Sequence, residues 1–194
     1  MNIKEIELRH FEKNDFESFK KVSRKNADHI SRYLKDGQIF KEISNREYKE
    51  MYRRYLYRIS EFEFLGGFFE GKLVGEVVLC PAHRINATQF TYWVDQDFIN
   101  QGVATELVMR ASEYCFKKGY WSIEVYVEEG NIESERVMEK CGFNRYSNSQ
   151  QLDEDSGRII KYSDWEKINP GPLNPFGPKG PFDFLKPRRF TNPI

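Results

Sequence analysis

The sequence predicts a mixed α/β fold, and three observations lead to this prediction. Short runs of alternating apolar and polar residues predict strands, and longer runs with apolar residues at every third or fourth position predict helices. In chain order these elements read β-α-α-β-β-β-α-β-α-β-β. With 194 residues, the chain is long enough for one domain with a substantial core.

The first part of the chain predicts one strand and two helices. Residues 3–11 alternate as a strand, and residues 14–25 follow a helical pattern. Residues 26–43 are polar and predict an irregular segment. Ser44 and Glu47 form a capping box that starts the second helix. The apolar residues of this helix recur at helical spacing: Tyr48, Met51, Tyr52, Tyr55, Leu56 and Ile59.

The middle of the chain predicts three strands, of which the first two form a hairpin. Residues 62–69 and 73–79 are strand patterns on either side of a Glu-Gly-Lys turn at residues 70–72. Residues 89–94 predict the third strand. Antiparallel pairing is therefore expected for at least part of the sheet.

The last part of the chain returns to alternating helices and strands. A helix with one apolar face runs from Ala104 and ends at Gly119. Residues 123–127 alternate as a strand, and residues 131–141 predict a short helix. Residues 143–164 predict a final hairpin with an acidic loop at its tip. Helices between strands in this order imply crossovers in a mixed sheet.

The composition argues against several classes of function. The chain has 30 basic and 30 acidic residues, which speaks against nucleic-acid binding driven by phosphate neutralisation. Its three cysteines form no CxxC pair and its three histidines have no ligand spacing, so we expect no metal site. No segment approaches the ~18 apolar residues of a membrane span, and the first residues lack a signal-peptide core. We expect a soluble, cytoplasmic protein without membrane contact.

The composition changes near the end of the chain, which divides it into a domain of residues 1–168 and a tail of residues 169–194. The tail holds seven of the eight prolines and is basic. Proline prevents a regular helix or a central strand, whereas the many phenylalanines of the tail favour apolar partners. We expect the tail to pack in extended form over its own domain or over the other subunit of a homodimer, anchored by Phe182, Phe184 and Leu185.

The most informative stretch is the turn between the third strand of the middle region and the helix that follows. This turn, Gln101-Gly102-Val103-Ala104, opens directly into the helix. The first amides of a helix have no partner within it, and they point together toward one spot at the positive end of the helix dipole. Such a spot suits a pyrophosphate. Farther along, Asn131 and Ser134 open a second helix, which is followed by Gly142.

Together these motifs resemble the acetyl-coenzyme A (acetyl-CoA) site of the GNAT N-acetyltransferases, and most of all the Rim-type branch, which acetylates the N-termini of ribosomal proteins. Four blocks carry the resemblance: residues 92–94, 101–106, 131–134 and 139–143. The resemblance implies a mixed, mostly antiparallel sheet that splays at the cofactor site and has helices on both faces. It also implies which residues bind acetyl-CoA: Trp93, Val94, Gln101, Gly102, Val103, Ala104, Thr105, Asn131 and Ser134.

Two residues depart from the family pattern. The family turn begins with Gln or Arg where this chain has Ile99, which removes a polar contact but none of the backbone amides. Many members protonate the leaving thiolate with a tyrosine where this chain has Met138. We therefore assign proton donation to Ser134, or to a water that it holds.

The sequence defines the general base less sharply. Glu124 is the first candidate, on a strand that borders the expected splay, and Glu128 lies on the same polar side of that strand. Glu154, in the loop of the last hairpin, is a third candidate.

The implied acceptor is a primary amine. An α-amine has a pKa of about 7.7–8.0 against about 10.4 for lysine, and therefore needs less help from a base. A peptide or protein N-terminus is our first expectation. A small cationic amine, such as a polyamine or an aminoglycoside-like compound, is the alternative, and it would suit the acidic residues 153–155. A third hypothesis is a non-catalytic acetyl-CoA-binding module whose tail engages a partner.

Overall fold

One seven-stranded sheet organises the molecule. The computed structural model describes residues 2–58, 60–82, 84–154 and 156–171. The strand order is β1-β2-β3-β4-β5-β7-β6, and every neighbouring pair is antiparallel except β4 and β5. The strands are β1 (Glu7–His10), β2 (Glu63–Phe69), β3 (Lys72–Pro81), β4 (Ala87–Val94), β5 (Ser122–Glu128), β6 (Asn144–Asp153) and β7 (Arg158–Ile168).

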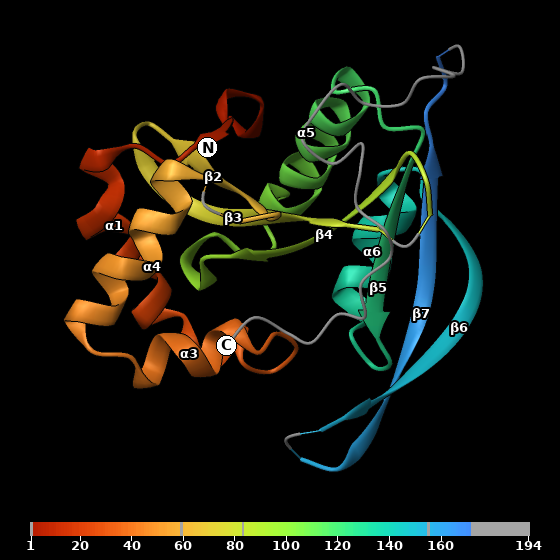
Figure 1. Cartoon of the computed structure of the whole chain (residues 1–194). Helices are drawn as coiled ribbons and strands as arrows, with labels where there is room; N and C mark the ends of the chain where they lie inside the picture. Colours follow the sequence, from red (N-terminus) through yellow and green to blue (C-terminus); the bar gives the residue numbers. More distant parts are fainter. Residues whose placement is uncertain (1, 59, 83, 155, 172–194) are drawn as a thin grey trace.

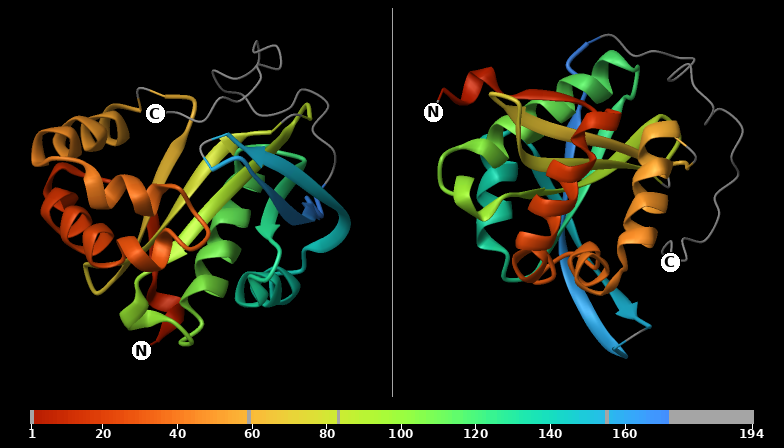
Figure 2. Two further views of the ribbon diagram at one scale, coloured as in Figure 1. Left: turned by 90° about the horizontal axis from the view of Figure 1, so that it is seen from below. Right: turned by 90° about the vertical axis from the view of Figure 1, so that its left-hand side faces the viewer.

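Helices cover both faces of this sheet, as expected. Helices α1 to α4 lie on one face, and α5 and α6 lie on the other (Figures 1 and 2). The helices are α1 (Phe16–Lys25), α2 (Ala27–Ile30), α3 (Asp36–Glu42), α4 (Asn45–Tyr57), α5 (Val103–Lys117) and α6 (Ile132–Lys140). Each face therefore has its own core, an aromatic one beneath α1–α4 and a mainly aliphatic one beneath α5 and α6.

The predicted element order is confirmed except for one segment. Residues 26–43, predicted to be irregular, contain α2 and α3. These helices are too short to be stable alone, and they form because Ala27, Ile30 and Phe40 are buried in the aromatic core. The first strand is also shorter than predicted, because residues before Glu7 form the 3-10 turn η1 (Ile3–Glu5).

Two predicted turns have the expected local chemistry. Ser44 accepts a hydrogen bond from the Glu47 amide, and the Glu47 carboxylate accepts one from the Ser44 amide, which completes the capping box of α4. The β2–β3 hairpin turns at Glu70 and Gly71, which both have positive φ values (48° and 73°). This backbone matches the right-handed twist of the two strands.

Residues 172–194, which make up most of the predicted tail, fall outside the described residues, and so do Phe182, Phe184 and Leu185, the residues expected to anchor it. Three internal positions, Ile59, His83 and Asp155, fall outside them as well. The division at residue 168 and the packing of the tail stay predictions.

The expected splay of the sheet lies between β4 and β5. These strands pair in parallel only at Ala87–Ser122, Thr88–Ile123 and Gln89–Glu124. Beyond this point, β4 continues to pair only with β3 and β5 only with β7. Figure 1 shows β5, β6 and β7 strongly rotated against β2, β3 and β4. The main chains of residues 90–94 and 125–128 therefore border a gap.

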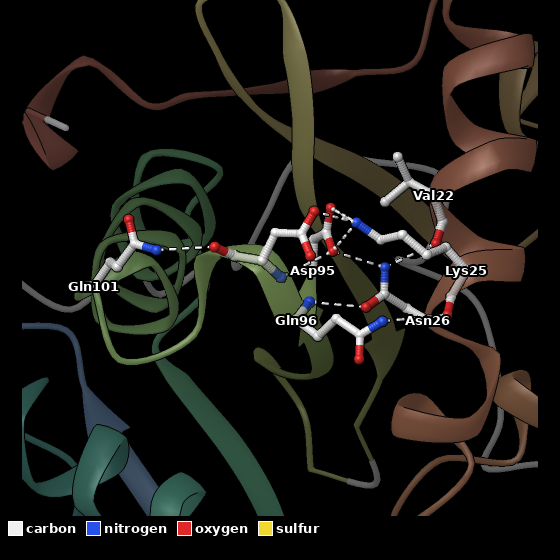
Figure 3. Close-up of polar contacts among 7 residues, drawn as sticks. Val22, Lys25, Asn26, Asp95, Gln96 and Gln101 are labelled. Atoms are coloured by element: carbon white, nitrogen blue, oxygen red, sulfur yellow. Dashed lines mark hydrogen bonds and ion pairs between the residues drawn. The ribbon is translucent and has the colours of Figure 1, made fainter.

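A buried polar cluster ties the end of α1 to the chain that leaves β4 (Figure 3). The Asn26 side chain donates to Asp95 Oδ1 (2.9 Å) and accepts from the Gln96 amide (2.8 Å). Lys25 Nζ lies 2.6 Å from Asp95 Oδ1 and 2.8 Å from Asp97 Oδ2. Asn26 is fully buried and Asp95 is 3% exposed, so the bond between them forms away from water, whereas Lys25 and Asp97 are exposed. This Lys25–Asn26–Asp95 cluster fixes the loop that leads from β4 to α5.

Removing the Asn26 side chain is expected to destabilise the fold, because the buried Asp95 carboxylate loses one of its donors and the part-buried Gln96 amide loses its acceptor. We predict that Asn26→Ala lowers the free energy of unfolding by about 2–4 kcal/mol. Gln96→Ala is the matched control, because that side chain makes only a 3.5 Å contact with the Lys25 carbonyl, and we expect a change below about 0.5 kcal/mol. Urea unfolding of both variants measures the difference. Equal stability of the two variants would contradict a structural role for the cluster.

Candidate active site

The N-terminus of α5 is built as an open amide site. Gly102 is its N-cap residue in the left-handed conformation (φ 84°), and no side chain caps the helix there. The amides of Val103, Ala104 and Thr105 therefore lack the partner that a capping side chain would supply. A Cβ atom on Gly102 would lie 3.1 Å from Ile3 Cδ1. Glycine is thus required both by the backbone and by the neighbouring side chain.

The side chains of this turn differ in their roles. Val103 is buried in the core beneath α5, whereas Ala104 and Thr105 are half-buried. Gln101 is exposed, and its side chain donates to the Asp97 carbonyl (2.9 Å; Figure 3). Ile99, which stands in place of the family's polar residue, is 44% exposed. Only the backbone of Val103 is available to a ligand, while Thr105 offers its side chain too.

Buried side chains flank the gap between β4 and β5 on the α5 and α6 face. Phe90 is 2% exposed, Val94 7%, Val125 4% and Val127 3%. The Asp95 amide donates to Val74 of β3 (2.9 Å), and successive amides along a strand point to opposite edges. The Val94 amide therefore points into the gap. Main-chain groups in such a place need a partner, and an extended ligand that binds as an added strand would supply it.

Asn131 and Ser134 lie together at the start of α6. Asn131 Oδ1 accepts the Ser134 amide (3.2 Å), so Asn131 caps the helix. This leaves only its NH₂ group to bind a cofactor. Ser134 Oγ lies 3.1 Å from the Tyr92 hydroxyl of β4, which donates to it. The hydroxyl of Ser134 is therefore oriented by a partner and keeps its own proton for donation.

Tyr92 contributes a polar group to the site. Burial raises the pKa of Tyr92 to about 12, so that it remains a hydrogen-bond donor at neutral pH. Strand alternation places Tyr92 on the opposite face from Trp93, toward α5 and α6. This alternation is the sequence signal that puts Tyr92 on the side of the proposed cofactor site.

Trp93 belongs to the other face of the sheet. Its ring is buried in the aromatic core, and its Nε1 donates to Glu76 Oε2 of β3 (2.8 Å). Only the main chain of Trp93 can therefore meet a ligand that lies along the α5 side of the gap. The same holds for Val94, whose side chain packs in the core beneath α5.

Glu124 is not a free, solvated carboxylate. It is 3% exposed, forms an ion pair with Arg84, and accepts a hydrogen bond from the Tyr126 hydroxyl (2.9 Å). Arg84 pairs with Glu166 as well. Glu124 also faces Gln89 in the last β4–β5 pair, at the closed end of the gap. The Glu124 carboxylate is therefore already engaged by a guanidinium and a phenol.

The other two candidate bases are less constrained. Glu128 is half-buried, and burial raises its pKa. Glu154 is exposed in the β6–β7 loop.

Sequence reasoning missed one carboxylate that the structure singles out. Glu76 lies in the middle of β3, is 1% exposed, and has no hydrogen-bond partner for its Oε1 atom. Burial raises the pKa of Glu76 to about 8, with a smaller contribution from the charge of Asp36. An acidic residue within the apolar run of residues 73–79 was the available signal.

Within residues 2–58, 60–82, 84–154 and 156–171, no three His, Cys, Asp or Glu side chains come together as metal ligands. None of the helices in this described part is both long and apolar enough to span a bilayer.

Comparison with solved structures shows the fold. The microcin C7 self-immunity acetyltransferase MccE, solved with acetyl-CoA and AMP, superimposes with a TM-score of 0.72 at 15% identity over 85% of this chain and 93% of that one. RimL, the ribosomal L7/L12 alpha-N-protein acetyltransferase solved with coenzyme A, gives 0.72 at 16% identity, over 84% and 93%. The spermidine N-acetyltransferase of Vibrio cholerae, solved with CoA and spermine, gives 0.68 at 20% identity, over 85% and 96%.

Comparison with sequences gives the family. No curated protein sequence matches the chain. The sequence profile of the acetyltransferase (GNAT) domain matches residues 5–144, which is most of the chain. The match includes β4, the uncapped N-terminus of α5 and the Asn131–Ser134 turn. The chain therefore belongs to the GNAT family of acetyl-CoA-dependent N-acetyltransferases.

Proposed function

We propose that this protein transfers the acetyl group of acetyl-CoA to the α-amine of a peptide or protein N-terminus. One observation carries the proposal: the Tyr92–Ser134 pair lies beside a gap that has unpaired strand edges and an uncapped helix N-terminus. These features supply partners for the extended arm, the pyrophosphate and the leaving thiolate of one ligand. In this proposal the acetyl-CoA ligands are the residues predicted from the sequence, with Trp93 and Val94 acting through their main chain.

The residues divide the chemistry among them. The amides at the start of α5 hold the pyrophosphate at the positive end of the helix dipole. The Val94 amide stabilises the charge that develops on the thioester oxygen. Ser134 donates a proton to the leaving thiolate, and Tyr92 holds the Ser134 hydroxyl in place. Glu124 would act as a base only if Arg84 released it.

A small cationic amine remains the second candidate acceptor. Its support was the acidic loop after β6, but Asp153 in this loop already pairs with Lys35 of the helical layer (2.6 Å). The loop therefore offers less free negative charge than its sequence suggests. Members of the fold act on either class, since RimL is a protein acetyltransferase and another relative is a spermidine acetyltransferase. A homodimer and a cytoplasmic location stay predictions.

A panel of acceptors tests the proposed function. The protein is incubated with acetyl-CoA and either a library of peptides with free N-termini or a set of polyamines and aminoglycosides, and the products are identified by mass spectrometry. Thiol release measured in parallel reports turnover. We expect acetylated peptide N-termini. Acetylation of small amines alone would reject the first choice, and binding without turnover would favour a non-catalytic module.

The pyrophosphate site is tested at Thr105, because any side chain at Gly102 would be strained. We predict that Thr105→Glu weakens acetyl-CoA binding at least tenfold by bringing a carboxylate near the diphosphate. The fold should tolerate the change, since acidic residues are favourable in the first turn of a helix. Thr105→Gln is the neutral control and should bind within about threefold of wild type. Calorimetry measures the acetyl-CoA affinity of both variants. Equal affinity of the Thr105→Glu and Thr105→Gln variants would place the pyrophosphate elsewhere.

The proton donor is tested by a pair of variants. We predict that Ser134→Ala lowers kcat by roughly 10²-fold, with a smaller effect on acetyl-CoA affinity, because the thiolate loses its proton source. Tyr92→Phe keeps the Ser134 proton and should lower kcat less than about tenfold. If Tyr92→Phe is as damaging as Ser134→Ala, the tyrosine is the donor. An unchanged kcat in Ser134→Ala would remove Ser134 from the mechanism.

A further inference from the structure

The Glu76 carboxylate is buried, and its two oxygen atoms differ in their contacts. Its Oε2 atom accepts from the indole of Trp93, whereas its Oε1 atom has no partner in the described part of the chain. No lysine or arginine of that part forms an ion pair with it. A buried carboxylate without a cation is costly, and such groups are usually retained for a ligand or a reaction.

A second carboxylate lies near Glu76. Asp36 is the first residue of α3 and is half-buried, and no hydrogen bond or ion pair engages it among the described residues. Phe40, one turn later on the same side of α3, packs edge-on against the Trp93 ring, with 6.5 Å between ring centroids. Asp36 is therefore on the side of α3 that faces the sheet. Its charge contributes to the raised pKa of Glu76.

The groups around this pair are aromatic. Tyr48, Tyr52 and Tyr55 of α4 pack in the same aromatic core. Burial raises the pKa of all three, and the charge of Glu76 adds a smaller contribution. Arg24 of α1 lies over the Tyr48 ring (4.8 Å), but its guanidinium donates to Asn45 and to the Ile43 carbonyl. Two carboxylates among aromatic rings match the chemistry of a bound ammonium group, which such rings also attract.

The position of Glu76 in the sheet relates it to the gap between β4 and β5. Glu76 is the cross-strand neighbour of Trp93, which lies in the part of β4 that no longer pairs with β5. Both side chains project to the face opposite α5, away from the proposed path of acetyl-CoA. An acceptor on this face would approach the thioester from the other side of the sheet.

We propose that Glu76 and Asp36 receive the ammonium group of the acceptor and that Glu76 removes its proton. The inference rests on the proposed acetyl transfer. Asp36, the more accessible carboxylate, attracts the cation, and Glu76 Oε1 accepts one proton as an N–H bond breaks. The freed nitrogen lone pair bonds to the thioester carbon, and the C–S bond breaks.

The protons balance in this scheme. An ammonium group loses two protons on becoming an amide. One passes through Glu76 to solvent. The second leaves the nitrogen and returns through water to the Ser134 oxygen, which has given its own proton to the thiolate. A carboxyl group with a pKa of about 8 matches an α-amine, whose pKa is about 7.7–8.0, far better than it matches a lysine or polyamine amine.

Kinetics with the full chain tests the proposal. With a peptide that wild type acetylates, we expect Glu76→Gln to lower acceptor kcat/KM at least 10²-fold, while acetyl-CoA affinity by calorimetry stays within twofold. The rise of kcat/KM with pH near 8 that Glu76 contributes should disappear. Glu76→Asp should restore part of the activity. Glu113→Gln, which removes an exposed carboxylate of α5, is the control for charge loss and should match wild type.

Stability against pH gives a readout that is independent of turnover. The pKa of Glu76 is raised in the folded protein, so the folded state keeps a proton that the unfolded chain loses above about pH 4.5. Burial of Glu76 therefore costs stability that grows from about pH 4.5 to 8 and is complete above pH 8. We expect the Tm of Glu76→Gln to equal that of wild type at pH 4 and to exceed it at pH 9.

The outcomes separate this inference from the proposed function. If wild type acetylates no amine, the proposed function fails. If wild type is active and Glu76→Gln keeps its kcat/KM and pH profile, the inference about Glu76 is overturned. Asp36→Asn, at a half-buried position, covers the case in which Glu76 variants do not fold. It should raise the acceptor KM about tenfold with acetyl-CoA affinity unchanged, and an unchanged KM would equally overturn the inference.

Discussion

The structure depends on a single parallel strand pair that ends early. β4 and β5 hold together over three residue pairs and then follow different partners, β3 on one side and β7 on the other. The strands beyond this point are lined by buried side chains, so their inner edges have little access to water. Backbone groups in such a place need hydrogen bonds. Among the described residues, the Asn131 amide pairs with the Glu128 carbonyl (3.0 Å), but β4 beyond Gln89 has no partner on the edge that faces the gap. The site that we propose for acetyl-CoA is thus a defect of the sheet, and the other features of the proposed site are arranged around it.

In our proposal, the two faces of the sheet serve different parts of the reaction. On the α5 and α6 face, the helix N-terminus and the Tyr92–Ser134 pair surround the gap. On the opposite face, the helical layer α1–α4 covers Trp93 and the unpaired Glu76. The Lys25–Asn26–Asp95 cluster joins the two, because it anchors the loop before α5 to the end of α1 (Figure 3). The geometry of the cofactor turn therefore depends on a helix of the other face.

The sequence predicted most of the fold because most elements carry their own signal. The alternation of apolar and polar residues predicted the strands. Helical spacing of apolar residues and capping residues predicted α1, α4, α5 and α6, and the turn at Gly102 led to the proposed cofactor site. The helices α2 and α3 were missed because their stability comes from contacts with the aromatic core, which short polar segments do not reveal. The surroundings of the carboxylates Glu124 and Glu76 could not be predicted from the sequence either. Glu124 is held by a loop arginine 40 positions earlier, and Glu76 is isolated only once α3 and α4 pack over it.

Hydrogen exchange of the backbone amides, with and without acetyl-CoA, tests the central claim most directly. If the gap and the helix N-terminus hold the cofactor, acetyl-CoA should slow exchange in residues 90–94 of β4, in residues 103–105 at the start of α5, and in residues 125–128 of β5. Mass spectrometry of short proteolytic fragments resolves these segments from the rest of the sheet. Saturable binding of acetyl-CoA that leaves exchange in all three segments unchanged would contradict the account.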